Sequence, residues 1–171
     1  MTIETIFTGL SNAGRLVPIL LFLIPLATFV ISWMHGVYDG RRAPWRQIYG
    51  LAVQVTTLFL TALAALIALY ILEGGTVRDV IVPRTAFYYV AGTWLLTLLV
   101  VKRAVDFIHI PAVKNPLLLL FGWVLAWAVG MGLYISGLWL VPGPPLYTTL
   151  LAVAVFFLIF EMILALSGRR R

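Results

Sequence analysis

The chain has no cysteine, and few of its residues carry a charge. Without cysteine, disulfides, thiolate catalysis, iron–sulfur clusters and Cys-ligated zinc are excluded. Charged residues occupy 11% of the 171 positions, against about 25% in an ordinary soluble domain, whereas hydrophobic residues occupy 63%. A soluble fold of this size has too small an interior to hide that much apolar surface. The composition therefore predicts a helical integral membrane protein.

Recognised catalytic signatures are missing as well. The sequence has no Ser-His-Asp arrangement, no HExxH motif, no glycine loop for phosphates and no pair of intramembrane carboxylates. The DxxH spacing at residues 106–109 is too short a pattern to count as a signature. The twelve basic residues form no separate basic domain, so they do not indicate nucleic-acid binding. The sequence therefore favours a role that is not enzymatic and that needs no cofactor.

Stretches without charge or histidine are long enough to cross a bilayer, which takes about 20 residues per helix. The run at 115–160 is long enough for two helices, and the VPGPP segment at 141–145 divides it because a proline-rich segment cannot continue a helix. The predicted fold is a single all-α domain over residues 1–171. Its five transmembrane helices are expected at about 16–34, 48–72, 85–101, 116–140 and 146–166. Residues 1–14 are expected to form a short interfacial helix, or else a terminus that only a partner orders.

Basic residues gather in three clusters between and after these spans. The clusters are Arg41, Arg42 and Arg46; Lys102, Arg103 and Lys114; and Arg169, Arg170 and Arg171. With five spans all three clusters fall on one face, and the other face carries only Arg15, Arg78 and Arg84. Loops rich in basic residues stay in the cytoplasm. We therefore expect the N-terminus on the outer side and the C-terminus in the cytoplasm, in a cytoplasmic membrane of the bacterial type. The clustered side chains, with the exception of Lys114, are expected to meet anionic lipid headgroups.

Glu161 is the one acidic residue well inside a predicted span. A carboxylate at that depth is costly and usually faces the protein interior or water. Three interpretations stay open. The side chain reaches the cytoplasmic headgroups or pairs with Arg169, Lys102 or Arg103; it contacts another subunit; or it carries protons or cations.

Two histidines and two aspartates form a candidate metal site. His35 and Asp39 follow the first span, and Asp106 and His109 follow the third, all on the predicted cytoplasmic side. Two imidazoles and two carboxylates suit zinc, iron or manganese, provided that the first and third helices are neighbours. Haem held by the two histidines is a less favoured variant. The competing interpretation is two ordinary polar loops, because the spacing matches no strong motif.

Small residues recur every four positions in the second and fourth spans. They are Thr57, Thr61 and Ala65, and Gly122, Ala126 and Gly130. Small residues at this spacing let helix backbones approach closely inside lipid, which favours helix packing. The alternative is a ligand groove lined by Gln54 and the threonines.

Trp94 and Trp127 lie deep within their spans, where each indole N–H needs a partner. We expect hydrogen bonds between helices, with a bound lipid, quinone or pigment as the alternative.

These features favour a non-catalytic subunit or assembly partner of a larger membrane complex. Its partners would be the lipid bilayer and either other membrane subunits or further copies of the chain. A small self-associating transporter or channel that uses Glu161 is the first alternative. A membrane redox or metal-binding subunit that uses His35 and His109 is the second.

Overall fold

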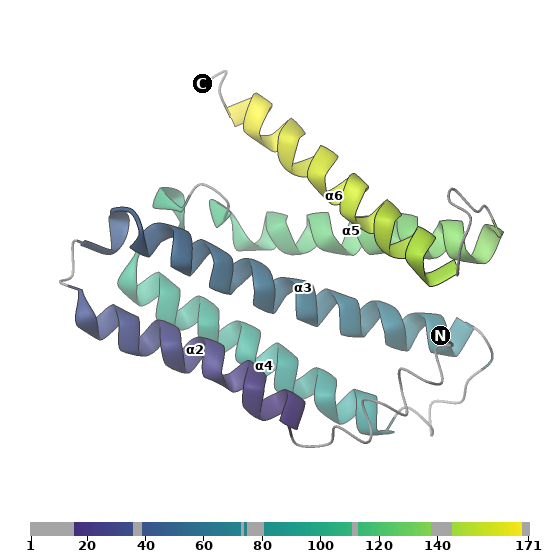
Figure 1. Cartoon of the computed structure of the whole chain (residues 1–171), viewed down its shortest axis with the longest axis horizontal. Coiled ribbons are helices and arrows are strands. Elements are labelled where there is room, and N and C mark those ends of the chain that lie inside the picture. Colours follow the sequence, from purple (N-terminus) through teal and green to yellow (C-terminus); the bar gives the residue numbers. More distant parts are fainter. Residues whose placement is uncertain are drawn as a thin grey trace. The chain divides into compact units, whose positions relative to one another are not determined.

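The computed structural model of the chain describes residues 16–35, 39–72, 74, 81–110, 113–137 and 145–168 (Figure 1). Over these residues the protein is all-α, with five α-helices and two short 3-10 helices. The α-helices are α2 (Leu16–Met34), α3 (Trp45–Leu72), α4 (Ile81–Ala104), α5 (Pro116–Ser136) and α6 (Pro145–Gly168). The 3-10 helices are η1 (Asp39–Arg41) and η2 (Phe107–His109). The predicted helical class is confirmed, and one described helix overlaps each predicted span. The expectation for residues 1–14 lies outside the described residues.

The start of α5 is set by Asn115 and Pro116. The side-chain Oδ1 of Asn115 accepts hydrogen bonds from the backbone N–H groups of Leu117, at 3.0 Å, and Leu118, at 3.3 Å. These are two of the N–H groups that the first turn of a helix leaves without a partner. Pro116 occupies the first helical position, where its missing N–H costs nothing.

Glycine sets the end of α5. Gly137 has a φ of +68°, in the left-handed region that favours glycine, and its N–H donates to the Tyr134 carbonyl at 3.3 Å. The helix therefore ends at Ser136, short of the predicted residue 140. Gly74, which follows α3, has the same kind of backbone, with a φ of +92°.

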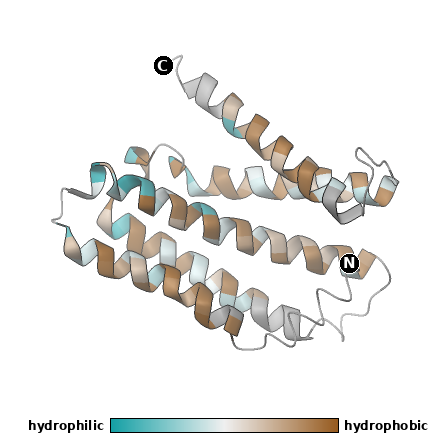
Figure 2. Cartoon of the chain, viewed as in Figure 1, coloured by the Kyte–Doolittle hydropathy of each residue, from teal (hydrophilic) through white to brown (hydrophobic). Residues whose placement is uncertain are grey.

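Two of the described helices, α3 and α5, are long and apolar enough to cross a membrane. Shorter apolar stretches lie in α2, at Ile19–Met34, and in α6, at Thr148–Ile163. This criterion rests on length and composition alone, and the buried core helix of a soluble protein also meets it. Figure 2 shows apolar residues along most of each helix and hydrophilic residues near the start of α3.

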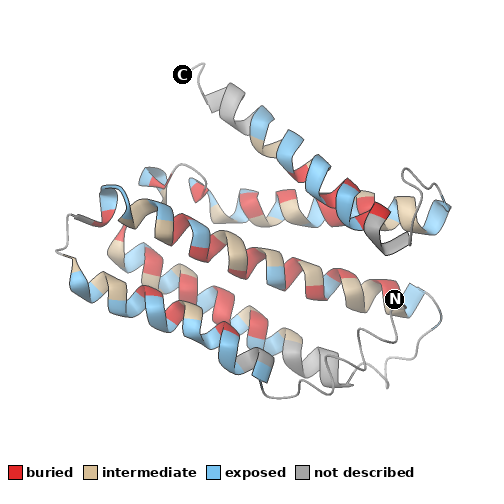
Figure 3. Cartoon of the chain, viewed as in Figure 1, coloured by how far each residue is buried: buried red, intermediate tan, exposed pale blue. Residues whose placement is uncertain are grey.

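One compact unit comprises Thr2–Leu119 and contains α2, α3 and α4. Helix α4 packs against both α2 and α3, whereas α2 and α3 contact each other less (Figure 1). Buried residues recur along the facing sides of these helices (Figure 3). The largest buried side chains include Tyr49, Val53, Val101 and Ile110. The core of this unit is therefore a stripe along each helix rather than a central layer.

Threonine hydroxyls share this interior with apolar side chains. Among the residues of this unit that the structure describes, the buried threonines are Thr28, Thr56, Thr57, Thr61, Thr93 and Thr97. Each hydroxyl donates to a backbone carbonyl of its own helix; Thr57 bonds Val53 at 2.7 Å, and Thr97 bonds Thr93 at 2.8 Å. A hydroxyl satisfied in this way can be buried without an unpaired donor.

The other compact unit comprises Leu120–Arg171 and contains most of α5 together with α6. The two helices form an antiparallel hairpin whose close contacts depend on glycine. Gly122 lies against the ring of Phe160, and a Cβ added at Gly130 would lie 2.5 Å from Cγ2 of Val153. The Trp123 ring stacks on Phe157 with 3.7 Å between centroids. A methyl group at either glycine would require Phe160 or Val153 to shift or the helices to separate.

Candidate functional site

The end of α2, the start of α3 and the end of α4 meet at one end of the first unit. A Cβ added at Gly40, in η1, would lie 3.1 Å from the carbonyl oxygen of Ala104, and one added at Gly50, in α3, would lie 3.1 Å from Cγ2 of Ile110. The predicted basic clusters at 41–46 and 102–103 therefore lie at the same end of the three helices. The segment after α2 therefore lies close to the last residue of α4, and a side chain at Gly40 would crowd the Ala104 carbonyl.

His35 directly follows α2 and is held by aromatic residues of α3. Its Nε2 shares a hydrogen bond with the hydroxyl of Tyr49, a side chain with no exposed surface. The imidazole also lies 5.3 Å from the ring of Trp45, centroid to centroid. The imidazole thus joins the end of α2 to the start of α3. This pair could not be predicted from the sequence, because His35 and Tyr49 share no recognisable motif.

The other predicted metal ligands are placed differently. Asp106 and His109 are exposed, one just before η2 and the other at its end. The side chain of Asp39 lies outside the described residues. Within the described part of the chain, no three His, Cys, Asp or Glu side chains are grouped closely enough to hold a metal ion. The metal site stays a prediction.

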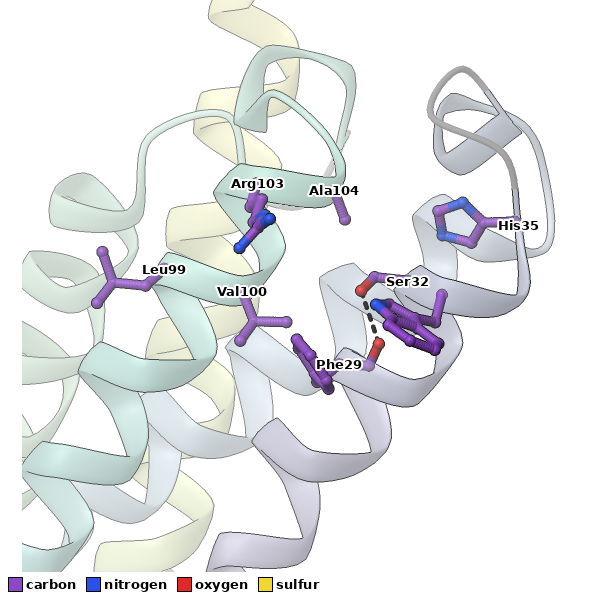
Figure 4. Close-up of a pocket in the computed structure, with 8 residues that line it drawn as sticks. Phe29, Ser32, His35, Leu99, Val100, Arg103 and Ala104 are labelled. Carbon is purple, nitrogen blue, oxygen red and sulfur yellow. Dashed lines mark hydrogen bonds between the residues drawn. The ribbon is translucent and has the colours of Figure 1, made fainter.

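A groove of about 520 Å³ opens beside His35, between the last turns of α2 and α4 (Figure 4). The α2 side contributes Phe29, Ser32, Trp33 and His35. The α4 side contributes Leu99, Val100, Arg103 and Ala104. Figure 4 shows Arg103 and Val100 on one wall and Phe29 and Ser32 on the other.

The polar groups of the groove differ in whether they already have a hydrogen-bond partner. The Ser32 hydroxyl donates to the Phe29 carbonyl at 2.6 Å, and the imidazole is bonded to Tyr49. Arg103 is exposed and forms no ion pair with any residue that the structure describes. The guanidinium is therefore the strongest hydrogen-bond donor in the groove that is still without a partner among the described residues. The distribution of charge along the sequence did not indicate a groove at this place.

Glu161 lies on α6, half-buried, seven residues before the helix ends at Gly168. The next two residues, Met162 and Ile163, are exposed and apolar. In the described part of the chain no side chain or backbone group bonds the carboxylate. Arg169, one of its predicted partners, lies outside the described residues.

The small residues predicted to pack helices are all buried. Thr57, Thr61 and Ala65 lie on the buried side of α3, and Gly122, Ala126 and Gly130 are buried on α5. The hydroxyls of Thr57 and Thr61 are bonded within α3, and Gln54 is half-buried.

The two deep tryptophans have different outcomes. The indole N–H of Trp94 donates to the Thr57 hydroxyl across the α3–α4 interface at 2.9 Å, which confirms the expected bond between helices. The Trp127 indole N–H is buried without a partner among the described residues, so the same expectation is wrong there. The Trp123 indole N–H is likewise buried and unpartnered.

Of the basic side chains predicted to meet headgroups, all but one of those that the structure describes are exposed. Those described as exposed are Arg41, Arg42, Lys102 and Arg103, and Lys114 is exposed as well. Arg46 is half-buried. Arg169, Arg170 and Arg171 lie outside the described residues.

Comparison with known proteins gives no relative to reason from. No protein-family model, no curated protein and no solved structure matches the chain.

Proposed function

We propose that the chain is a five-span integral membrane protein that serves as a non-catalytic subunit or assembly partner of a larger membrane complex. In this proposal α2 to α6 are the five spans, the N-terminus is outside, and the basic clusters face the cytoplasm. The end of the first unit that carries Arg41, Arg42, Lys102 and Arg103 would then lie at the cytoplasmic headgroups.

The surfaces of the helices support the membrane location. Large apolar side chains are exposed along every described helix, among them Leu20, Leu51, Leu99, Phe121 and Leu158. Contiguous apolar surface of more than a few hundred Å² is rare on soluble monomers. Lipid would cover this surface, while the polar backbone is satisfied inside each helix.

The position of the Glu161 carboxylate and its lack of a described partner are the main support for the subunit role. Its position lies about 10 Å from the end of α6, at 1.5 Å per residue, and its carboxylate has no partner in the described part of the chain. A carboxylate at that depth in lipid is costly unless a donor or a cation meets it. A basic or hydroxyl side chain from another subunit, seated against this face of α6, would supply that partner.

The interior of the first unit supports a structural rather than a transporting role. Thr57 and Thr61, the polar residues that a pathway through α3 would use, donate to carbonyls of their own helix. Thr57 also accepts the hydrogen bond from Trp94. The Thr57 hydroxyl therefore links α3 to α4, and the Thr61 hydroxyl is satisfied within α3.

Affinity purification from native membranes in a mild detergent tests the proposal. The wild-type chain should bring other membrane proteins with it in fixed stoichiometry. Glu161→Leu should release them, because the partner's polar group would face an apolar side chain. Leu158→Met, one turn earlier on α6, is the matched control and should keep them.

Three results would overturn the proposal. A lone wild-type monomer, or a complex that Glu161→Leu leaves intact, contradicts the subunit role. Self-association with an ion flux that Glu161→Gln abolishes in liposomes would favour the transporter alternative. A coloured or metal-containing preparation would favour the redox or metal-binding alternative.

A further inference from the structure

We propose that the groove between the last turns of α2 and α4 binds one anionic phospholipid, with its phosphate at Arg103 and an acyl chain along Phe29, Leu99 and Val100. The inference rests on the membrane location proposed above. It adds a specific lipid to the general contact between basic residues and headgroups.

Both walls of the groove change from apolar to polar side chains toward the ends of their helices. On α4, Arg103 lies one turn beyond Leu99, nearer the helix end, about 6 Å along the axis. On α2, Trp33 lies one turn beyond Phe29, again nearer the helix end. Polar groups therefore gather at the end of both helices and apolar groups lie one turn deeper. A phospholipid has the same order along its length, from phosphate to acyl chain.

The polar end of the groove suits a phosphate. Arg103 offers several N–H donors in one plane, and no described carboxylate pairs with them. The Trp33 side chain is 84% exposed, so its indole N–H is accessible as a second donor. Because a phosphate oxygen carries negative charge, hydrogen bonds from the guanidinium and from the indole N–H to it are both charge-assisted, and the guanidinium adds an ion pair. Ser32 and His35 are engaged with Phe29 and Tyr49, so they shape the groove rather than supply the main donors.

The deeper part of the groove favours a lipid over free phosphate. Phe29 and Leu99 are both exposed, and nothing in an inorganic anion would cover them. The volume of about 520 Å³ lies within the range of roughly 300–1,000 Å³ that is typical of small-molecule sites. Covering these side chains with an acyl chain adds a hydrophobic contribution that free phosphate lacks.

Native mass spectrometry of the full chain in mild detergent tests the inference. Phosphatidylglycerol, phosphatidylcholine and inorganic phosphate would be titrated separately into the wild-type protein and three variants. Arg103→Gln removes the charge from the groove. Lys102→Gln removes the neighbouring exposed charge, which does not line the groove, and is the matched control. Ala104→Phe fills the groove and keeps the charge.

The wild-type chain should hold one phosphatidylglycerol at least about tenfold more tightly than phosphatidylcholine, and phosphate should not compete. Arg103→Gln should weaken that binding about tenfold or more, as expected for the loss of a charge-assisted contact. Lys102→Gln should leave it unchanged, and Ala104→Phe should abolish it. If Ala104→Phe does not fold, the comparison of Arg103→Gln with Lys102→Gln decides.

Three outcomes would overturn the inference. Equal losses in Arg103→Gln and Lys102→Gln would mean a diffuse surface charge. Effective competition by inorganic phosphate would mean an anion site without lipid. Equal binding of the two lipids would mean no recognition of charge. Extraction of membranes with alkaline carbonate distinguishes these failures from failure of the proposed function. Release of the chain by carbonate would contradict the membrane location itself. A chain that stays in the membrane but shows no lipid preference would contradict only this inference.

Discussion

The indole N–H of Trp94 on α4 donates a hydrogen bond to the Thr57 hydroxyl on α3, with 2.9 Å between Nε1 and Oγ1. The same hydroxyl donates to the Val53 carbonyl at 2.7 Å, so one threonine accepts from one helix and donates within another. Both side chains are buried, at 8% and 0% exposed. This pair fixes the register of α4 against α3.

Replacing Trp94 with Phe should lower the free energy of unfolding. The substitution removes the donor and part of the ring, so the total loss should be about 1–3 kcal/mol, of which the hydrogen bond contributes about 0.6 and at most about 1.7 kcal/mol. Unfolding in mixtures of dodecyl maltoside and sodium dodecyl sulfate measures the loss.

A double-mutant cycle with Thr57→Val isolates the bond, because valine keeps the shape and loses the hydroxyl. We expect the two losses to be less than additive. Strict additivity would contradict a direct bond between these side chains.

Gly130→Ala should destabilise the α5–α6 hairpin. The new methyl group would lie 2.5 Å from Cγ2 of Val153 and 3.2 Å from the Thr149 carbonyl oxygen, and β-branched Val153 has little freedom to move aside within a helix. The expected loss in free energy of unfolding is about 1–3 kcal/mol.

Gly132→Ala is the control for this substitution. It lies on the same helix, and an added Cβ would meet nothing within 4 Å in the structure. Alanine has a higher helix propensity than glycine, so this variant should be as stable as the wild type or more stable by up to about 1 kcal/mol. If the two variants behave alike, the close approach at Gly130 is wrong.

Tyr49→Phe should loosen the end of α2. The substitution leaves the Nε2 atom of His35 without its phenol partner at a half-buried site, which costs about 0.5–1.5 kcal/mol. Amide hydrogen exchange at residues 32–35 should speed up, because that segment opens more often.

Tyr89→Phe serves as the control for Tyr49→Phe. Tyr89 lies on α4 and is 59% exposed. Removing its hydroxyl should leave amide hydrogen exchange at residues 32–35 unchanged. Exchange that stays slow in Tyr49→Phe would mean that the histidine does not hold α2 to α3.

The absence of cysteine makes the proposed topology directly testable. Single cysteines at Arg42, Gly74 and Lys114 would be probed with a maleimide that does not cross membranes. Only the cysteine at position 74 should react in intact cells, and those at 42 and 114 should react after the membrane is permeabilised. Labelling of position 42 or 114 in intact cells would contradict the proposed orientation or the number of spans.

Much of the helical layout follows from the distribution of charge and proline. The predicted range 16–34 coincides with α2, and the long apolar run divides as predicted, because α5 ends at Ser136 and α6 begins at Pro145. The predicted range 85–101 was too short for α4, which spans Ile81–Ala104. Charged side chains are compatible with helical hydrogen bonding, so α4 runs through Arg84, Lys102 and Arg103 even though the charge-free stretch stops there.

The site was harder to predict than the helices. The bond between His35 and Tyr49 and the groove at Arg103 each join residues from different helices, and periodicity within one helix says nothing about such contacts. Trp94 was the exception, because a buried indole needs a partner and Thr57 was the polar residue that met it. The same argument failed for Trp127, whose indole N–H is buried without a described partner.

Photo-crosslinking from position 158 tests the subunit role most directly. A benzophenone side chain would replace Leu158 in cells, one turn before Glu161, so that the carboxylate is kept. The same group at Ile163, which is also exposed and lies about 140° around α6 from Leu158, would be the control. We predict that position 158 crosslinks to a different membrane protein in a single adduct, and that position 163 crosslinks chiefly to lipid. No protein adduct from position 158, or only an adduct with a second copy of this chain, would contradict the assignment of this chain as a subunit of a larger membrane complex.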